Sequence, residues 1–239
     1  MFSTNLCLIA TGRYMEFVPN LLRAAWRWFL PDFDVTYHIF TDTIHSELQS
    51  QRPIRWHAWP HKPWPHGTLM RYHAMRSAEE ELLKADQTYY IDADMDIVAH
   101  VGDEIFSDLV AVRHHGYMST HPYHLPYERR GESQACVPLQ LSKCYYAGAF
   151  QGGRTEHWMQ AMRAMQQGID ADIKNGITAI NNDESFWNQY LATRTPTLIL
   201  PPQYCWHPPH PGRPYSIFDP EKPPKIVALD KNHDTVRAI

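Results

Sequence analysis

Three aspartates, Asp92, Asp94 and Asp96, stand two residues apart in the segment YYIDADMDIV, residues 89–98. If this segment is one strand, its side chains alternate between faces, so the three carboxylates point the same way with neighbours about 7 Å apart. At an effective dielectric constant near 20, one neighbouring pair repels by roughly 2 kcal/mol. The segment therefore needs something that offsets this repulsion.

Two interpretations account for the acidic run. In the first, a half-buried strand ends in an acidic turn in water, where solvent and salt screen the repulsion. In the second, the carboxylates bind a divalent cation such as Mg²⁺ or Mn²⁺, which takes oxygen ligands from one or two carboxylates and from substrate phosphates. The D-x-D spacing does not decide between them, so the position of the segment in the fold must do so.

Strand-like and helix-like segments alternate through the first third of the chain. Short apolar or β-branched runs predict strands at residues 5–10, 35–40 and 54–59. Apolar stripes predict helices at residues 16–30, 46–49 and 68–83, the last capped by Thr68. This order predicts a parallel sheet covered by helices. Because ligands bind at the carboxyl ends of strands in such sheets, and the acidic run lies where a strand ends, the cation interpretation is favoured.

The remaining chain predicts fewer regular elements. We expect helices at residues 102–109, 154–167 and 183–192, and strands at residues 111–114, 145–153 and 197–200. From Pro201 onward the prolines are dense, which predicts irregular loop. Asp183 and Glu184 stand at the start of the helix predicted at residues 183–192, where the helix dipole favours negative charge, so each could be a simple N-terminal cap.

Composition excludes several classes of protein. The chain has 239 residues, 44% of them hydrophobic, and a formal net charge of -4. We expect one globular domain and no binding to nucleic acid, because a duplex binder needs a basic face. The chain has no basic leader and no run of about 18 apolar residues, so we expect a soluble protein without a transmembrane segment.

Cysteine and histidine show no metal-binding motif. The four cysteines, at positions 7, 136, 144 and 205, have no C-x-x-C spacing, which favours free thiols in a cytoplasm. The fifteen histidines include no H-E-x-x-H pair, and many lie beside prolines and tryptophans. We interpret most of them as surface or packing residues.

Several motifs, in one consistent order, resemble those of the retaining family 6 glycosyltransferases, which include the blood-group A and B transferases and the α-1,3-galactosyltransferase. They cover nearly the whole chain: ATGRY, HIFTD, TLMR, YYIDADMD, THP, YERR, YYAGAFQGG, NNDESFWNQYL, PTLILPPQYCW and KNHDTVR. The resemblance implies the A-type glycosyltransferase fold, with a Rossmann-like, mainly parallel sheet flanked by helices. It further implies transfer of GalNAc or Gal from a UDP-sugar to the 3-OH of a galactoside, fucosylated or not, in an α-1,3 linkage.

The resemblance also implies roles for residues around the donor. Asp92 and Asp94 would bind Mn²⁺, for which Mg²⁺ could substitute, whereas Asp96 has no family role and is interpreted as a solvated or structural carboxylate. The other donor-site residues would be Ala10, Thr11 and Tyr14 at the uridine, Arg71 at the sugar, Ala147 and Ala149 at the position that selects the sugar, and Lys231 and Arg237 at the diphosphate. Small residues at 147 and 149 favour GalNAc over Gal. Without the family, Tyr14 could be a packing residue at a helix start, Arg71 a structural counter-ion and the basic tail a solvated face.

For the reacting centre, the resemblance implies that Glu184 lies under the anomeric carbon as nucleophile or as electrostatic support, and that Asp183 binds hydroxyls of the donor sugar. His121 would bind the acceptor. Asn181 and His207 stand where the family has tryptophan and aspartate at the acceptor, so the resemblance leaves the acceptor open. The family division would be a nucleotide-sugar half, about residues 1–112, and an acceptor-binding and catalytic half, about residues 113–239, with a closing tail.

Two alternatives to this function remain at the level of sequence. One is a phosphotransferase that uses D-x-D as nucleophile and acid, although such enzymes carry the motif after their first strand. The other is a non-catalytic module that binds a glycan or a UDP-sugar. The anchorless chain resembles bacterial or phage members of the family, which favours a cytoplasmic location. The oligomeric state is left open.

Overall fold

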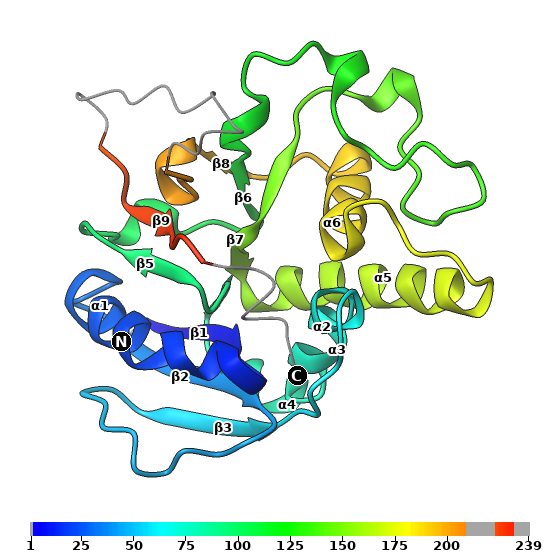
Figure 1. The fold of residues 1–239 in the computed structure, drawn as a ribbon. Helices are drawn as coiled ribbons and strands as arrows, with labels where there is room; N and C mark the ends of the chain where they lie inside the picture. The colour runs from blue at the N-terminus through cyan, green and yellow to red at the C-terminus, as the bar shows by residue number, and fades with distance from the viewer. Residues whose placement is uncertain (1, 209–222, 232–239) are drawn as a thin grey trace.

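The computed structural model describes residues 2–208 and 223–231, and its centre is a seven-stranded sheet (Figure 1). The strands follow the order β3-β2-β1-β4-β7-β6-β8. β1 pairs in parallel with β2 and β4, β2 with β3, and β6 with β8, whereas β7 runs antiparallel to β4 and β6. The predicted mainly parallel sheet is therefore confirmed. The bounds are β1 Ser3–Ile9, β2 Asp34–Thr41, β3 Ile54–Ala58, β4 Gln87–Ile91, β6 Val110–Arg113, β7 Tyr146–Arg154 and β8 Leu198–Leu200.

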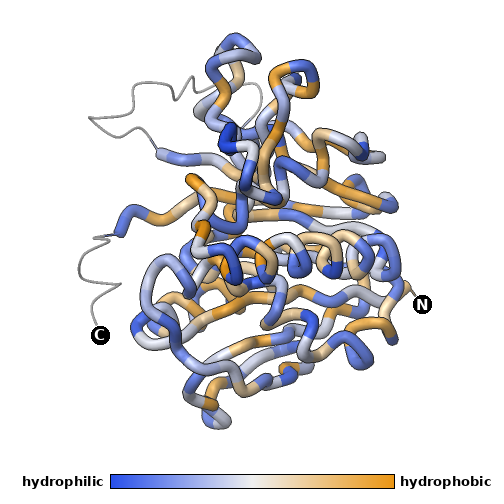
Figure 2. Tube along the Cα trace, turned by 90° about the vertical axis from the view of Figure 1, so that its right-hand side faces the viewer, coloured by the Kyte–Doolittle hydropathy of each residue, from blue (hydrophilic) through white to orange (hydrophobic). Residues whose placement is uncertain are grey.

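Side chains that alternate along the strands form a separate apolar core on each face of the sheet. Leu6 and Leu8 of β1 pack with the buried side of helix α1, Val18–Trp28, whereas Cys7 packs on the other face with helices α3, α5 and α6. Helices thus cover both faces, as in other mainly parallel sheets. This explains why every residue of β4 is buried. Figure 2 shows apolar residues following the strands and polar residues gathering at the outer turns.

The helix predicted at residues 68–83 is instead three short helices. They are α2 His66–Leu69, α3 Arg71–Arg76 and α4 Glu79–Leu82. The chain leaves helical geometry at Met70 and Ala78, and Thr68 does not cap a helix but bonds back to the carbonyl of Pro65 at 2.9 Å. The break after Leu69 accompanies the burial of both Leu69 and Arg71, which places the guanidinium of Arg71 inside the molecule.

Other helix predictions hold with changed bounds or fail. The first helix starts as the 3₁₀ segment η1, Gly12–Phe17, before α1, and the two later helices are α5 Thr155–Lys174 and α6 Asn182–Thr193. Residues 46–49 form only a turn, and the helix expected at 102–109 is only the short η2, Asp103–Ile105. Leu48 and Ile105 of these segments pack on the core, but a helix of so few residues gains too few backbone hydrogen bonds to be stable by itself.

The acidic segment 89–98 is not one strand, which corrects the premise that its three carboxylates share a face. β4 ends at Ile91, and a turn follows in which Met95 N–H donates to the carbonyl of Asp92 at 3.1 Å. The chain then enters β5, Met95–Ile97, which pairs antiparallel with β9, Ile226–Ala228 (Figure 1). Asp92 and Asp94 therefore lie in the turn, and Asp96 lies in the small sheet.

The tail beyond Pro201 contains one strand that its prolines did not predict. After Pro224 the β-branched run of β9 pairs with β5, so residues 226–228 lie beside the strand that follows the acidic turn. All four cysteines are free, as expected. Within residues 2–208 and 223–231, no helix is long and apolar enough to cross a membrane.

Candidate active site at the carboxyl edge of the sheet

The parallel strands β1 to β4 end at one edge of the sheet, and a pocket of about 190 Å³ lies there. Ala10 and Thr11 follow β1, and Asp92 follows β4. Ala10 is fully buried beneath this edge. Fourteen residues line the pocket: Ile9, Thr11, Tyr14, His61, Lys62, Trp64, Gly67, Thr68, Arg71, Tyr90, Asp92, Ala93, Asp94 and Lys231. The structure thus brings together most of the predicted donor-site residues.

Arg71 joins three elements at the inner end of this pocket. It is only 5% exposed, and its Nη2 donates to Asp92 Oδ1 at 2.9 Å, while its Nη1 donates to the carbonyl of Gly148 at 2.6 Å. Its Nε lies 3.0 Å from Asp183 Oδ2, and its guanidinium stacks on the ring of Tyr90 at 4.4 Å. Since a buried cation is stable only when paired, Arg71 fixes Asp92 and Asp183 relative to each other.

Lys231, which follows β9, lines the same pocket. Its Nζ forms an ion pair with Asp94 Oδ2 and lies 4.8 Å from the ring centroid of Tyr14. Tyr14 also packs partly on the core beside α1, so its ring has both a packing contact and a cation contact. Arg237, the other predicted tail residue, lies outside the described residues.

Glu184 is held by the backbone of β7 at the first turn of α6. Gly148 N–H donates to its Oε2 at 2.7 Å, and the Tyr145 hydroxyl forms a further hydrogen bond with it. A Cβ added to Gly148 would lie 3.3 Å from the Glu184 carboxylate and 3.5 Å from Arg71, so a larger residue here would crowd the carboxylate. The helix N-cap residue is Asn181, not Asp183 or Glu184. The position of the Glu184 carboxylate is therefore fixed by two hydrogen-bond donors from outside its own helix.

Both carboxyls at the start of α6 have raised pKa values. Burial raises the pKa of Glu184 to about 7; the neighbouring Asp183 adds to this effect, whereas Gly148 N–H and Tyr145 oppose it. Burial also raises the pKa of Asp183 to about 6, against the opposing charge of Arg71. Near neutral pH these groups lie close to their titration points, which is typical of reacting carboxyls.

The three predicted acceptor residues are placed differently. Asn181 Nδ2 donates to the Tyr145 hydroxyl at 2.8 Å, and this hydroxyl is in turn hydrogen-bonded to Glu184. His207 stacks on His114, 6.0 Å between centroids, and His114 lies 5.8 Å from the ring of Tyr145. His121 is exposed, and its ring contacts those of Tyr123 and His124. Asn181 and His207 thus join the surroundings of Glu184, whereas His121 belongs to a separate loop.

Two residues that hold the carboxylates were missed from the sequence. The Tyr90 hydroxyl donates to Asp92 Oδ1 at 2.7 Å. Tyr90 stands two residues before Asp92, so strand alternation could have placed both on one face. Tyr145 could not be found in this way, because its partner Glu184 lies in a different element far along the chain.

Comparison with known proteins assigns the chain to a family. Residues 2–238 match the sequence profile described as Glycosyltransferase family 6. The chain belongs to glycosyltransferase family 6. This membership confirms the predicted resemblance and, with the observed sheet and helices, the A-type fold.

Several relatives of this family 6 chain are animal and bacterial transferases. It is 31% identical over 239 residues to the Histo-blood group ABO system transferase 2 of Rattus norvegicus, covering 97% of this chain and 70% of the relative. It is 31% identical over 240 residues to the Globoside alpha-1,3-N-acetylgalactosaminyltransferase 1 of Gallus gallus, covering 95% and 67%. It is 27% identical over 233 residues to the O-antigen biosynthesis glycosyltransferase WbnI of Escherichia coli, covering 97% and 96%.

Proposed function

We propose that this family 6 chain transfers GalNAc or Gal from a UDP-sugar to the 3-OH of a galactoside, with retention of configuration. One observation carries the proposal: Arg71 connects the D-x-D residue Asp92 to Asp183, next to Glu184, in one buried network beside the pocket. A nucleotide-binding end and a reacting end are thereby joined. The name of the Gallus gallus relative, an alpha-1,3-N-acetylgalactosaminyltransferase, supports GalNAc as the sugar.

The pocket contains suitable partners for a nucleoside diphosphate. We assign the uridine to the part lined by Thr11 and Tyr14, where an aromatic ring can stack on a base. Ala10, buried beneath them, is assigned to the floor of this part. The Lys231 ammonium is assigned to the diphosphate, together with Arg237, which lies outside the described residues. Cations there stabilise the negative charge that develops on the departing diphosphate.

The donor set of the acidic turn fits Mn²⁺, with Mg²⁺ as substitute. Asp92 and Asp94 provide carboxylate oxygens at the pocket wall, and the Lys231 ammonium on Asp94 shows that this carboxylate attracts a cation. Two protein carboxylates suit a hard divalent ion that takes its other ligands from phosphate oxygens and water. Such an ion would supply positive charge to the leaving diphosphate.

Glu184 is assigned to the reacting centre and Asp183 to the hydroxyls of the donor sugar. The Gly148 N–H and the Tyr145 hydroxyl fix the Glu184 carboxylate, which can attack or electrostatically stabilise an oxocarbenium-like anomeric carbon once it is ionised. Retention requires two inversions through a covalent intermediate, or departure and attack on the same face. Either route uses the same carboxylate in the same place.

Donor selection is assigned to the residues that flank Gly148, and acceptor binding to a separate set of residues. Ala147 and Ala149 flank Gly148 on β7, and their small side chains favour GalNAc, although one methylene group is worth only about 1–3 kcal/mol of discrimination. On the acceptor side we assign His121, Asn181 and His207. Localisation in the cytoplasm stays a prediction.

The experiment is an assay with UDP-GalNAc or UDP-Gal, Mn²⁺ and a panel of galactosides, fucosylated and not. We expect an α-1,3-linked product that disappears in EDTA and falls by about two orders of magnitude or more in Asp94→Asn, because the ion and its ligand carry diphosphate charge. Full activity in EDTA would contradict the metal assignment. Metal-dependent phosphate release from simple esters would favour a phosphotransferase, and UDP binding without any turnover would favour a binding module.

A further inference from the structure

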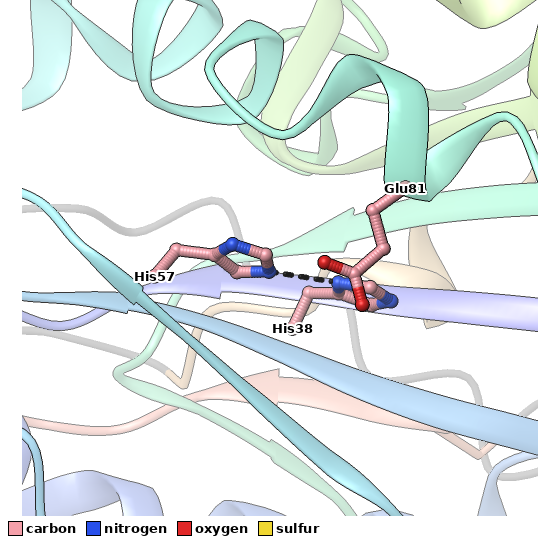
Figure 3. Close-up of side chains that lie close together, drawn as sticks. All are labelled: His38, His57 and Glu81. Carbon is pink, nitrogen blue, oxygen red and sulfur yellow. Dashed lines mark hydrogen bonds between the residues drawn. The ribbon is translucent and has the colours of Figure 1, made fainter.

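A cluster of His38, His57 and Glu81 lies outside the candidate active site, on strands β2 and β3 and on helix α4 (Figure 3). We call it the His-His-Glu cluster. The nearest nitrogen and carboxylate atoms of the three side chains all lie within 4.8 Å of one another. His38 is buried, and the other two are partly exposed. It is the one group of three or more potential metal ligands within residues 2–208 and 223–231 that meets this distance criterion.

A buried asparagine fixes which nitrogen of His38 carries the proton. Asn5 Nδ2 donates to the carbonyl of Leu82 at 2.9 Å and to Thr88 Oγ1 at 3.0 Å. Since a carbonyl only accepts, the amide is oriented with its Oδ1 toward His38 Nε2, 3.0 Å away. His38 therefore holds its proton on Nε2 and presents an unprotonated Nδ1 to the cluster. In metal-binding histidines, the ring nitrogen that does not bind the metal typically donates a hydrogen bond to an oxygen acceptor in this way.

The second histidine faces this lone pair directly. His57 Nε2 lies 2.9 Å from His38 Nδ1, and the two rings are within 10° of parallel with centroids 5.2 Å apart. His57 Nε2 donates in this pair. Burial lowers the pKa of His38 to about 3, aided by the charges of His57 and Arg55, and burial also lowers the pKa of His57. Both rings are thus neutral near pH 7, the state in which imidazole binds a metal.

The third side chain leaves the cluster open to water. The Glu81 side chain is 37% exposed, and its Oε1 pairs with Arg55 Nε at 3.2 Å. β3 is an edge strand of the sheet, so His57 has a neighbouring strand on one side only. An ion can therefore reach the cluster from solvent, and a coordination position can remain for water.

We propose that His38 Nδ1, His57 Nε2 and a Glu81 carboxylate oxygen form a Zn²⁺ site, with water as fourth ligand. Two imidazoles and one carboxylate are a known zinc set, whereas the oxygen-only pair Asp92 and Asp94 suits Mn²⁺. On binding, the proton of His57 moves from Nε2 to Nδ1, so the ring stays neutral and no proton is released. The two nitrogens must separate from 2.9 Å to about 3.3 Å for tetrahedral bonds of about 2.0 Å, which requires a tilt of His57 at the sheet edge.

Such an ion would connect the edge strand β3 to its neighbour β2 and to helix α4. It would stabilise the folded chain by mass action, since the three ligands meet only in the folded state. The site lies apart from the proposed catalytic residues, so its presence does not depend on the proposed glycosyl transfer.

The test is a calorimetric titration of Zn²⁺ into the full chain with Asp94→Asn as background, so that the acidic turn contributes less binding. We expect one equivalent of Zn²⁺, a raised melting temperature, and with Co²⁺ the visible absorption of a tetrahedral complex. His57→Gln and Glu81→Gln should each weaken binding by more than the about 10–100-fold that loss of an outer hydrogen-bonding partner costs. Arg55→Gln should strengthen binding, because it frees Glu81 and removes a positive charge beside the ion.

The matched control is His45→Gln, since His45 is also a histidine beside a glutamate, 3.0 Å from Glu47, but belongs to no group of three potential metal ligands in the described part of the chain. Its affinity for Zn²⁺ should equal that of the background. Absence of saturable Zn²⁺ binding would overturn the proposal, as would equal affinity in Glu81→Gln and the background. Glu81 and Arg55 are exposed enough to replace without loss of the fold, so this pair of variants decides the case even if His57→Gln does not fold.

Discussion

At the scale of single residues, the site consists of carboxylates whose charge is controlled by their neighbours. Asp92 has Arg71 and Tyr90 as donors, whereas Glu184 has one backbone N–H and one hydroxyl and no direct cation partner among its described contacts. The balance between burial and hydrogen bonding therefore differs between them. It sets the pKa of Glu184 near 7, where ionisation and reactivity can change with pH.

Turnover should depend on the ionisation of Glu184. If the ionised carboxylate is required, kcat/KM rises with pH up to about 7 and then levels off, because the group is protonated below its raised pKa. The measurement is kcat/KM for donor transfer between about pH 5 and pH 8.5, with Mn²⁺ held constant.

Tyr145→Phe is the matched variant for this profile. The Tyr145 hydroxyl lowers the pKa of Glu184, so its removal should move the rising limb to higher pH while the helix is unchanged. A flat profile across this range, or an unmoved limb in the variant, would contradict the role of an ionised Glu184.

At the scale of elements, the site forms where short segments meet rather than within one of them. The turn after β4 carries Asp92 and Asp94, β7 supplies the backbone of Gly148, and α6 supplies Asp183 and Glu184. The β5–β9 pair returns the tail so that Lys231 reaches Asp94. Lys231 thus lines the candidate site, although it lies more than a hundred residues from the acidic turn.

Deletion of residues 230–239 should reduce turnover far more than it reduces the melting temperature. The deletion removes Lys231 but leaves β9 and the central sheet complete, so the loss falls on charge stabilisation of the diphosphate. Activity and thermal unfolding are measured on the same preparation. Lys231→Met, which keeps the chain length, serves as control and should reproduce most of the loss. Equal activity in the truncated chain would refute this role of the tail.

At the scale of the whole molecule, the two halves of the chain share one sheet. β7, from the second half, lies between β4 and β6, and the site takes residues from both halves. The functional division at about residue 112 stays a prediction. Burying carboxyls where the halves meet also has a cost for the stability of the whole fold, because each must lose its charge or its hydration.

Glu184→Gln should raise the melting temperature at alkaline pH while it abolishes turnover. The folded state holds the proton of Glu184 up to a pKa of about 7, above the ordinary pKa of 4.5 of a free glutamate side chain, so stability falls as pH rises between these values. The amide removes this penalty and keeps an acceptor for Gly148 N–H. Thermal unfolding at about pH 4 and pH 8.5 should show no gain at the lower pH and a gain of several degrees at the higher. An equal change at both would contradict the pKa argument, and near-normal turnover would remove the catalytic assignment.

The sequence alone was enough to predict the sheet class, most strand positions and the family, because periodicity and motif order are local properties of the chain. It placed the acidic run at the end of a strand but not the turn within the run, joined three short helices into one and missed β9, because those outcomes depend on packing between distant segments. Tyr145 and the backbone of Gly148 gained their roles only when β7 met α6. The His-His-Glu cluster likewise formed only when β2, β3 and α4 came together, since no sequence spacing records which side chains meet across a sheet.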